Sequence, residues 1–366
     1  MTAFRTRRLR LGDESNLNAI YNRIVGRERI KWSRSLEAMR WIWHQAPGGP
    51  VDSWVIETEV DTEWTIIGHH ALCPVRFTFG DEDLLCAKTM NSFLLPEFRD
   101  RFSYLRFEQE CLREVDARFD ATYSVGAGSS RLRSALGYTN FGTWIQFERG
   151  FQPLHVIYRV VANLVGRQSY SARARLLRVL ASISAVPVRE PSRELVELTS
   201  IDAPSSRFFS DFWKEARIGA GMAPRRGVED LEWRFWKRQG FQGTTLTYTS
   251  PVGRAYFIVE TANPVIYSLA DFYISPPQPE LFDNLLDALY VWCAQRGALA
   301  VRCRTITQGL PAALLEVLSC KMKPSVLQRF IPAFELPRRF SVAMRLRTNG
   351  VFPVWNTTDL LVVDSL

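Results

Sequence analysis

The sequence predicts an α/β protein built from two similar halves. Three observations lead to this prediction. Strand and helix patterns alternate through the first 150 residues, and the second half runs through nearly the same order of elements. A repeat of this length indicates a duplicated domain, because solenoid repeats are far shorter. The chain has 366 residues, 46% of them hydrophobic, which is enough for two cores.

Charge and cysteine content restrict the class of protein. The net charge of +8 suits a partner that carries phosphates or acidic groups, such as a nucleotide-type cofactor, an acidic carrier protein, nucleic acid or a lipid surface; a merely soluble basic protein is the alternative. The six cysteines form no CxxC pair and indicate reduced thiols in a cytoplasmic protein. The basic N-terminus is followed by no apolar run, and no window is apolar enough for a transmembrane segment.

The elements of the first half are predicted from the alternation of apolar and polar residues, from apolar residues at helical spacing and from turn residues. Strands are expected at 4–11, 53–60, 65–79 with a break near Pro74, 84–95, 121–125 and 143–149, and helices at 12–25, 35–44, 102–112 and 130–136. Residues 61–63 and 80–83 are expected to be hairpin turns.

Residues 90–112 are the segment on which the functional interpretation depends. In this segment a strand stops at Pro96, a basic turn follows, and a helix begins near Phe102. Free amides at a helix N-terminus, with the arginines of the turn, make a plausible anion cradle. An ordinary connection with solvated arginines is the alternative.

Beyond residue 150 the pattern changes and then begins again. Helical spacing at 154–165 and 176–183, with linkers to residue 205, indicates a connector between domains, or else a basic surface helix pair. Helices are then expected at 211–218, 227–236, 281–296 and 309–319, and strands at 244–249, 254–259, 266–275, 299–304, 326–331 and 340–346. The expected domains are therefore 1–150 and 206–366, joined by 151–205.

Short motifs in both halves resemble a known family. Residues 95–102, Leu-Pro-Glu-Phe-Arg-Asp-Arg-Phe, are similar to the run that leads into the phosphate loop of the GNAT-type N-acyltransferases. Residues 129–138 end in Leu-Gly-Tyr and resemble that family's Ser…Leu-Gly-Phe run. Residues 230–234, Asp-Leu-Glu-Trp-Arg, resemble a signature of its two-domain members, which include envelope, natural-product and Fem-type transferases.

The resemblance implies two tandem GNAT-like domains, each with a mixed, mostly antiparallel central sheet flanked by helices. It implies acyl transfer from coenzyme A or an acidic acyl carrier protein, as a cosubstrate rather than a permanently bound cofactor, to a small-molecule amine. The glycines of the family's phosphate loop align with Asp100, Phe102 and Tyr104, where a charge would repel a phosphate and two rings would crowd it. The family's tyrosine acid aligns with Arg133.

Three side chains are candidates for the catalytic base. His70 lies on the strand before the 84–95 strand, and Glu97 lies in the turn after it. His69 and His70 must point to opposite faces of their strand, and a structural histidine is the alternative for either. Asp271 is an acid inside an apolar strand of the second half, and an ion pair with an arginine is its alternative.

The remaining candidates bind donor or acceptor. The donor site is expected along the strand end and the turn, at Phe93, Leu94, Leu95, Arg99, Arg101, Phe102, Ser103 and Tyr104. The acceptor site is expected at Asn91, Ser129 and Ser130, although the two serines suit helix capping as well. A strand amide near this point would stabilise the oxyanion.

Other chemistries lack their motifs. The sequence has no P-loop, Gly-x-Ser-x-Gly, Gly-x-Gly-x-x-Gly or His-Glu-x-x-His run, and the four histidines have no metal-site spacing. Dispersed basic residues argue against sequence-specific DNA binding. The resemblance makes an N-acyltransferase the leading hypothesis. A catalytically inactive GNAT-like binding module and a Fem-type transferase using aminoacyl-tRNA are its alternatives.

Overall fold

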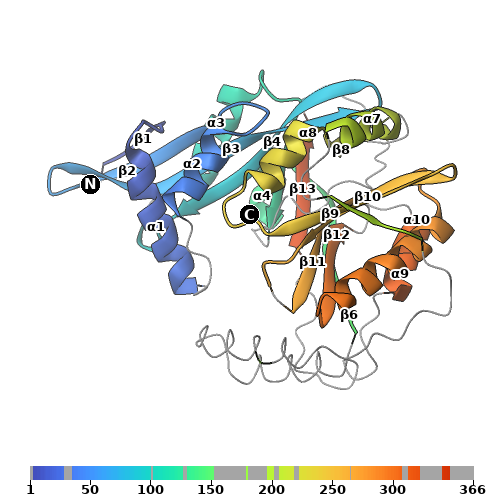
Figure 1. Ribbon diagram of the computed structural model, residues 1–366. Helices are drawn as coiled ribbons and strands as arrows, with labels where there is room; N and C mark the ends of the chain where they lie inside the picture. Colours follow the sequence, from blue (N-terminus) through green and yellow to red (C-terminus); the bar gives the residue numbers. More distant parts are fainter. Residues whose placement is uncertain are drawn as a thin grey trace. The chain divides into compact units, whose positions relative to one another are not determined.

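The computed structural model divides the chain into two compact units. The structure describes residues 3–28, 35–99, 102–126, 130–151, 179, 196–201, 206–217, 222–263, 265–306, 312–321 and 340–346. Unit 1 comprises Met1–Gly142 and Phe340–Pro353, and unit 2 comprises Thr143–Arg339 and Val354–Leu366. Figure 1 shows the helices and strands of both units, coloured from the N-terminus in blue to the C-terminus in red.

Unit 1 is a mixed sheet flanked by helices. Its elements are β1 (Phe4–Arg8), α1 (Asp13–Glu28), α2 (Leu36–His44), β2 (Asp52–Val60), β3 (Glu63–Phe79), β4 (Glu82–Leu94), the short helix η1 (Pro96–Phe98), α3 (Tyr104–Val115), β5 (Ala121–Gly126), α4 (Ser130–Ala135) and β13 (Phe340–Leu346). Its strands pair in the order β1-β2-β3-β4-β5-β13. Only β4 and β5 are parallel, and the other neighbours are antiparallel.

Unit 2 repeats this plan. Its elements are β6 (Thr139–Gly150), β7 (Thr199–Ile201), α7 (Ser206–Ala216), β8 (Met222–Pro224), α8 (Val228–Leu231), the π-helical turn η3 (Glu232–Trp236), β9 (Gly243–Ser250), β10 (Gly253–Glu260), β11 (Ile266–Ser275), α9 (Pro279–Gln295), β12 (Ala300–Ile306) and α10 (Ala312–Lys321). The strand order is β7-β9-β10-β11-β12-β6. Again only β11 and β12 are parallel. The predicted fold class, in which each half has a mixed, mostly antiparallel sheet flanked by helices, is confirmed.

The helices of unit 2 cover both faces of its sheet, as alternation along β10 requires. Ala255, Phe257 and Val259 pack in one apolar cluster with the side chains of α9. Tyr256 and Ile258 point the other way and pack in a second cluster with α7. Both faces are therefore buried, which explains why these strands read as continuous apolar runs.

The last strand of each repeat pairs with the other half of the chain. β6 follows β5 and α4 in sequence, but it pairs with β12, from Ala300↔Gly150 to Ile306↔Trp144. In return, β13 pairs with β5. The boundaries therefore differ from those expected: the strand predicted at 143–149 lies in unit 2, and the strand at 340–346 lies in unit 1. A sequence pattern locates a strand but not its distant partner. Nearly all of the expected connector 151–205 falls outside the described residues.

This exchange gives a testable prediction for the end of the chain. Truncation before Phe340 removes the partner that β13 provides for the backbone of β5. Amide hydrogen exchange in Ala121–Gly126 is expected to accelerate at least tenfold, because those amides lose a ladder partner. Amides of β10, which pairs with β9 and β11, serve as the internal control. Unchanged protection in β5 would contradict the observed pairing.

Most predicted elements of unit 1 are found within two or three residues, with one difference. β3 runs unbroken through Pro74, although a break was expected there. Pairing between β2 and β3 ends at Asp52↔Leu72, so the missing amide of Pro74 costs no ladder bond to β2. Asp61 and Thr62 have φ of 50° and 72°, which fits the expected hairpin turn. The strand expected at 326–331 lies outside the described residues.

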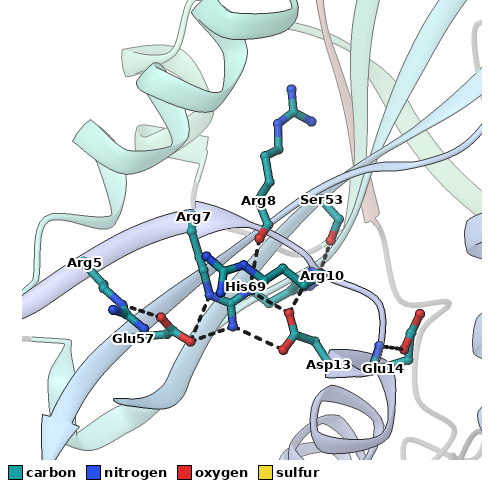
Figure 2. A network of polar contacts seen from close by, with 10 residues as sticks. Arg5, Arg7, Arg8, Arg10, Asp13, Glu14, Ser53, Glu57 and His69 are labelled. Carbon is teal, nitrogen blue, oxygen red and sulfur yellow. Dashed lines mark hydrogen bonds and ion pairs between the residues drawn. The ribbon is translucent and has the colours of Figure 1, made fainter. Parts of the chain in front are cut away.

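The basic N-terminal segment is held in a network of ion pairs, seen in Figure 2. The Arg5 Nε and Arg7 Nη2 atoms each lie 2.7 Å from an oxygen of the buried Glu57 carboxylate. Arg7 Nη1 also lies 2.6 Å from Asp13 Oδ2, which ties β1 to the start of α1. Burial raises the pKa of Glu57, but the two guanidiniums outweigh it and hold that pKa below its usual value. These arginines therefore stabilise the fold of unit 1.

Candidate functional site

A β-bulge in β4 organises the candidate site in unit 1. Between the pairs His69↔Phe93 and Ala71↔Met90, the single residue His70 of β3 faces both Asn91 and Ser92 of β4. Asn91 has φ of 52°, a left-handed conformation that asparagine tolerates better than most residues. β4 also diverges here from β5, because their described pairing covers only Cys86–Lys88 while β4 continues to Leu94. A comparable bulge occurs in β11 at Ala270, where Leu269 and Asp271 oppose Val259 and Ile258.

The two adjacent histidines lie on opposite faces of β3, as predicted. His69 packs against Trp43 of α2, and its ring bonds on both sides: Nδ1 lies 2.9 Å from the carbonyl oxygen of Asn91, and Nε2 lies 2.6 Å from the Ser53 hydroxyl. A carbonyl only accepts, so Nδ1 carries the proton and Nε2 accepts from Ser53. Burial lowers the pKa of His69 to about 4. His69 is therefore a satisfied, neutral structural residue.

His70 faces α3 and has less complete hydrogen bonding. Its side chain is fully buried, beside Phe107, and its Nδ1 lies 2.9 Å from the Ser92 hydroxyl. Among the described residues, no group hydrogen-bonds its Nε2. Burial, then the charges of Arg133 and His69, lower the pKa of His70 well below its usual value. The ring is therefore neutral at neutral pH.

A buried ion pair lies beneath His70. Arg133 of α4 donates to the Glu108 carboxylate of α3, which is fully buried and whose Oε1 is 3.8 Å from His70 Nδ1. Burial raises the pKa of Glu108, while the Arg133 guanidinium opposes that rise. Tyr104 donates its hydroxyl proton to the His69 carbonyl, 3.1 Å away, and its oxygen lies within hydrogen-bonding reach of the Ser92 hydroxyl. We call His70, Ser92, Tyr104, Glu108 and Arg133 the polar cluster.

The predicted donor-binding residues form the end of β4 and the turn after it. Leu94 and Leu95 are buried, and Phe93 is half-buried against His69. Arg99 is exposed, yet its Nε donates to the Leu94 carbonyl oxygen at 3.3 Å, which holds the guanidinium beside the strand end. Ser103 caps α3 by accepting from the Arg106 amide.

Phe102 and Tyr104, the two aromatic residues of the turn, pack against other rings of unit 1. Phe102 packs edge-on against Phe4 and Phe107, with centroids 5.5 and 6.0 Å apart. Tyr104 likewise packs against Phe107. These apolar contacts hold both side chains against the core of unit 1.

Only some of the other predicted site residues are described by the structure. Glu97 is exposed on η1, and Asn91 is the left-handed residue of the bulge. Ser130 is the first residue of α4, and its side chain is not described. Arg101 and Ser129 lie outside the described residues.

Asp271 forms the arginine ion pair that the sequence left open as its alternative role. Arg226 Nε and Nη2 lie 3.3 and 3.4 Å from its two carboxylate oxygens, and the Tyr256 hydroxyl donates to Oδ2 at 2.8 Å. Asp271 is 1% exposed. Arg226 also lies over the rings of Trp213 and Tyr273. A carboxylate so enclosed presents no oxygen to a substrate.

Unit 2 has apolar packing where unit 1 has the polar cluster. Between β10, β11 and α9, Phe257, Phe272 and Phe282 pack together, and the last two rings stack with centroids 5.4 Å apart. Ser275 to Pro279, the segment that leads into α9, contains three prolines, which have no amide to donate to an anion. The features that suit chemistry therefore gather in unit 1.

Comparisons with known proteins find similar folds but no similar sequence. No protein-family model and no curated protein matches the sequence. A probable N-acyltransferase from Enterococcus faecalis V583 is 10% identical over 94% of this chain and 73% of its own, with a TM-score of 0.58. A GCN5-related N-acetyltransferase from Anabaena variabilis ATCC 29413 is 12% identical over the same shares, with a TM-score of 0.56. Saccharomyces cerevisiae N-myristoyltransferase with bound myristoyl-CoA is 10% identical over 94% of this chain and 82% of its own, with a TM-score of 0.54.

The chain has a GNAT-like fold. The sequence predicts the candidate site at the strand end where the structure has the bulge, but it does not point to Ser92, Glu108 or Arg226, and it treats Arg133 only as a replaced tyrosine. One signal was available: Glu108 shares the buried side of α3 with Phe107, Cys111 and Leu112. An acid in an apolar stripe needs a buried partner.

The described residues lack two kinds of feature. Nowhere do they bring three His, Cys, Asp or Glu side chains together in a way that suits a metal ion. None of the helices they form is both long and apolar enough to cross a membrane. All six cysteines are free thiols, and only Cys320 is exposed.

Proposed function

We propose that the protein is an N-acyltransferase that moves an acyl group from a thioester donor, coenzyme A or an acyl carrier protein, to an amine by direct attack. The observation that carries this proposal is the bulged end of β4 in unit 1, beside a buried polar cluster, within a GNAT-like fold. Direct attack needs positioning, an oxyanion donor and one proton acceptor, and it needs no covalent enzyme intermediate.

Unit 1 is the donor half in this proposal. It has a histidine at the bulge, an arginine held at the strand end and a capped helix start after the turn. The corresponding part of unit 2 is filled by phenylalanines, and its ionic groups Arg226 and Asp271 neutralise each other. In this proposal unit 2 either binds the acceptor or stabilises the protein.

The donor lies along the end of β4 with its charged end at the turn. Phe93, Leu94 and Leu95 provide apolar contact for the acyl chain and thioester arm, and Arg99 and Arg101 provide charge for phosphates. The neighbour that carries myristoyl-CoA supports trying long acyl chains as well as acetyl.

Donor binding gives the first test. Acetyl-, octanoyl- and palmitoyl-coenzyme A, and the matching acyl carrier proteins, are each expected to raise the melting temperature if they are donors. Arg99→Ala is expected to weaken binding of the best donor about tenfold, since one charge-assisted contact is worth about 1.5 kcal/mol. Arg106→Ala is the matched control, because that arginine is exposed on α3 and its ion pair among the described residues is with Glu110. Equal effects of both variants, or no shift with any thioester, would count against the proposal.

The two alternative functions predict different results. A binding module without turnover binds a thioester but releases no free thiol with any amine. The unusual residues at the phosphate-loop positions favour that alternative. A Fem-type transferase, which the net charge of +8 would suit, acts only with aminoacyl-tRNA. Thiol release in a panel of amines, with and without charged tRNA, separates the three.

A further inference from the structure

Ser92 connects the buried His70 ring to the surface of unit 1. The bulge gives β4 one extra residue opposite His70, and Ser92 is exposed while His70 is fully buried. The distance from Ser92 Oγ to His70 Nδ1 is 2.9 Å. A substrate at the end of β4 can therefore touch the hydroxyl but not the imidazole.

The cluster is not arranged for an acyl-enzyme mechanism. In a Ser-His-acid triad, the hydroxyl and the carboxylate bond to opposite ring nitrogens, so that the acid orients the base. Here Ser92 Oγ and Glu108 Oε1 both approach Nδ1, at 2.9 and 3.8 Å. Glu108 is in addition bonded by Arg133. A seryl ester is not expected, and the geometry suits transfer of a proton through the hydroxyl.

We propose that Ser92 is a catalytic proton-relay residue, which passes the proton of the attacking amine to His70. This inference rests on the proposed acyltransferase function. As the amine nitrogen forms its bond to the thioester carbon, it gives a proton to Ser92 Oγ, and the hydroxyl proton of Ser92 moves to His70 Nδ1. The carbon–sulfur bond then breaks, and His70 returns the proton through Ser92 to the departing thiolate. The products are an amide and a free thiol, with atoms and charges balanced.

The relay fixes the tautomer of His70. Tyr104 gives its own hydroxyl proton to the His69 carbonyl, so the relay requires the one hydroxyl proton of Ser92 to be directed at His70 Nδ1 and not at the Tyr104 oxygen. Nδ1 must then be unprotonated, and the ring proton must be on Nε2. His69 next to it is the opposite tautomer, because its Nδ1 bonds a carbonyl. The two adjacent histidines are therefore protonated on different ring nitrogens, so each can serve as an internal reference for the other in a spectrum.

The charged and titratable groups around His70 determine the pH behaviour. Glu108 and Tyr104 face it from α3, Arg133 from α4 and His69 from its own strand. The ring accepts a proton only when neutral. Because the pKa of His70 lies well below 6.5, the acid limb of kcat is expected below pH 6.5.

Two measurements on Ser92→Ala and Ser92→Thr test the relay. With an active donor and amine, Ser92→Ala is expected to lower kcat about 100-fold with the donor KM unchanged and to lose the acid limb. Ser92→Thr keeps a hydroxyl and should retain most of kcat. Ser200→Ala, at an exposed serine of unit 2, should match the unchanged protein. Wild-type kcat in Ser92→Ala would overturn the relay.

The second measurement does not depend on activity. Nitrogen-15 NMR of the histidine rings should find His70 with its proton on Nε2 and His69 with its proton on Nδ1, and Ser92→Ala should shift the Nδ1 signal of His70 alone. A proton on His70 Nδ1, with Ser92 donating instead to Tyr104, would overturn the relay even if the protein is an acyltransferase. A wild-type protein without turnover but with the expected tautomers would reject the proposed function, and with it the catalytic role of Ser92.

Discussion

Arg226→Met is expected to lower the free energy of unfolding of unit 2 by about 3–5 kcal/mol, because it leaves a buried carboxylate without its counter-charge. Arg226 is 1% exposed, and so is Asp271. After the substitution the Tyr256 hydroxyl, 2.8 Å away, would still donate to Asp271, but the carboxylate would have no counter-charge left among the described residues. Denaturant unfolding, with hydrogen exchange followed in β10 and β11, measures the loss.

A surface pair in the same unit provides the matched control. Arg254 and Glu215 lie 3.1 Å apart, but Glu215 is 64% exposed. Glu215→Ala is therefore expected to cost less than about 1 kcal/mol. The double variant Arg226→Met/Asp271→Leu should recover much of the loss, since it removes both buried charges. A cost for Arg226→Met as small as the control would mean that water reaches the pair.

The same variants address the catalytic role once considered for Asp271. If Asp271 serves only to pair with Arg226, the double variant Arg226→Met/Asp271→Leu should keep thioester turnover near the wild-type rate at low temperature. The sequence left these two roles equal because an acid in an apolar strand has the same pattern in both. The deciding residue, Arg226, is 45 positions away and carries no local signal of its partner.

The fold was largely predictable because local patterns determine its elements. The alternation of β2 to β4 and the apolar stripe of α3 gave the element order, and the short motifs gave the class. Long-range pairing was not predictable in this way. β6 and β13 were each located correctly as strands, but each was assigned to the wrong sheet, because period-2 alternation is the same beside any partner.

The site was predictable at the level of the strand end but not of the hydrogen bonds. His70 and the β4 end follow from sequence position. The β-bulge does not, because a single extra residue leaves the apolar pattern nearly unchanged, and it is the bulge that brings Ser92 to His70. Likewise, the pairing of Glu108 with Arg133 depends on how α3 and α4 pack.

Arg133→Leu is expected to destabilise unit 1 by about 3 kcal/mol at pH 7, and by less at pH 5. Arg133 is the guanidinium bonded to the Glu108 carboxylate, whose side chain is fully buried. Burial already raises the pKa of Glu108, and removing Arg133 takes away the charge that opposes the rise. The folded protein then holds a proton on Glu108 that the unfolded chain has lost.

The sign of the pH dependence follows from this shift. With the folded pKa of Glu108 above the unfolded value of about 4.5, the folded state binds more protons between the two pKa values, so stability falls as pH rises through that window. Unfolding midpoints from pH 5 to 8 should therefore decline more steeply in Arg133→Leu than in the unchanged protein. Glu108→Gln/Arg133→Leu has no carboxyl at this position and should lose that added slope. Arg106→Leu, which breaks only the exposed pair with Glu110, should cost about 0.5 kcal/mol or less at every pH. A loss in Arg133→Leu that does not change with pH would contradict a buried, charged Glu108, and the electrostatic setting assigned to His70 would have to be replaced.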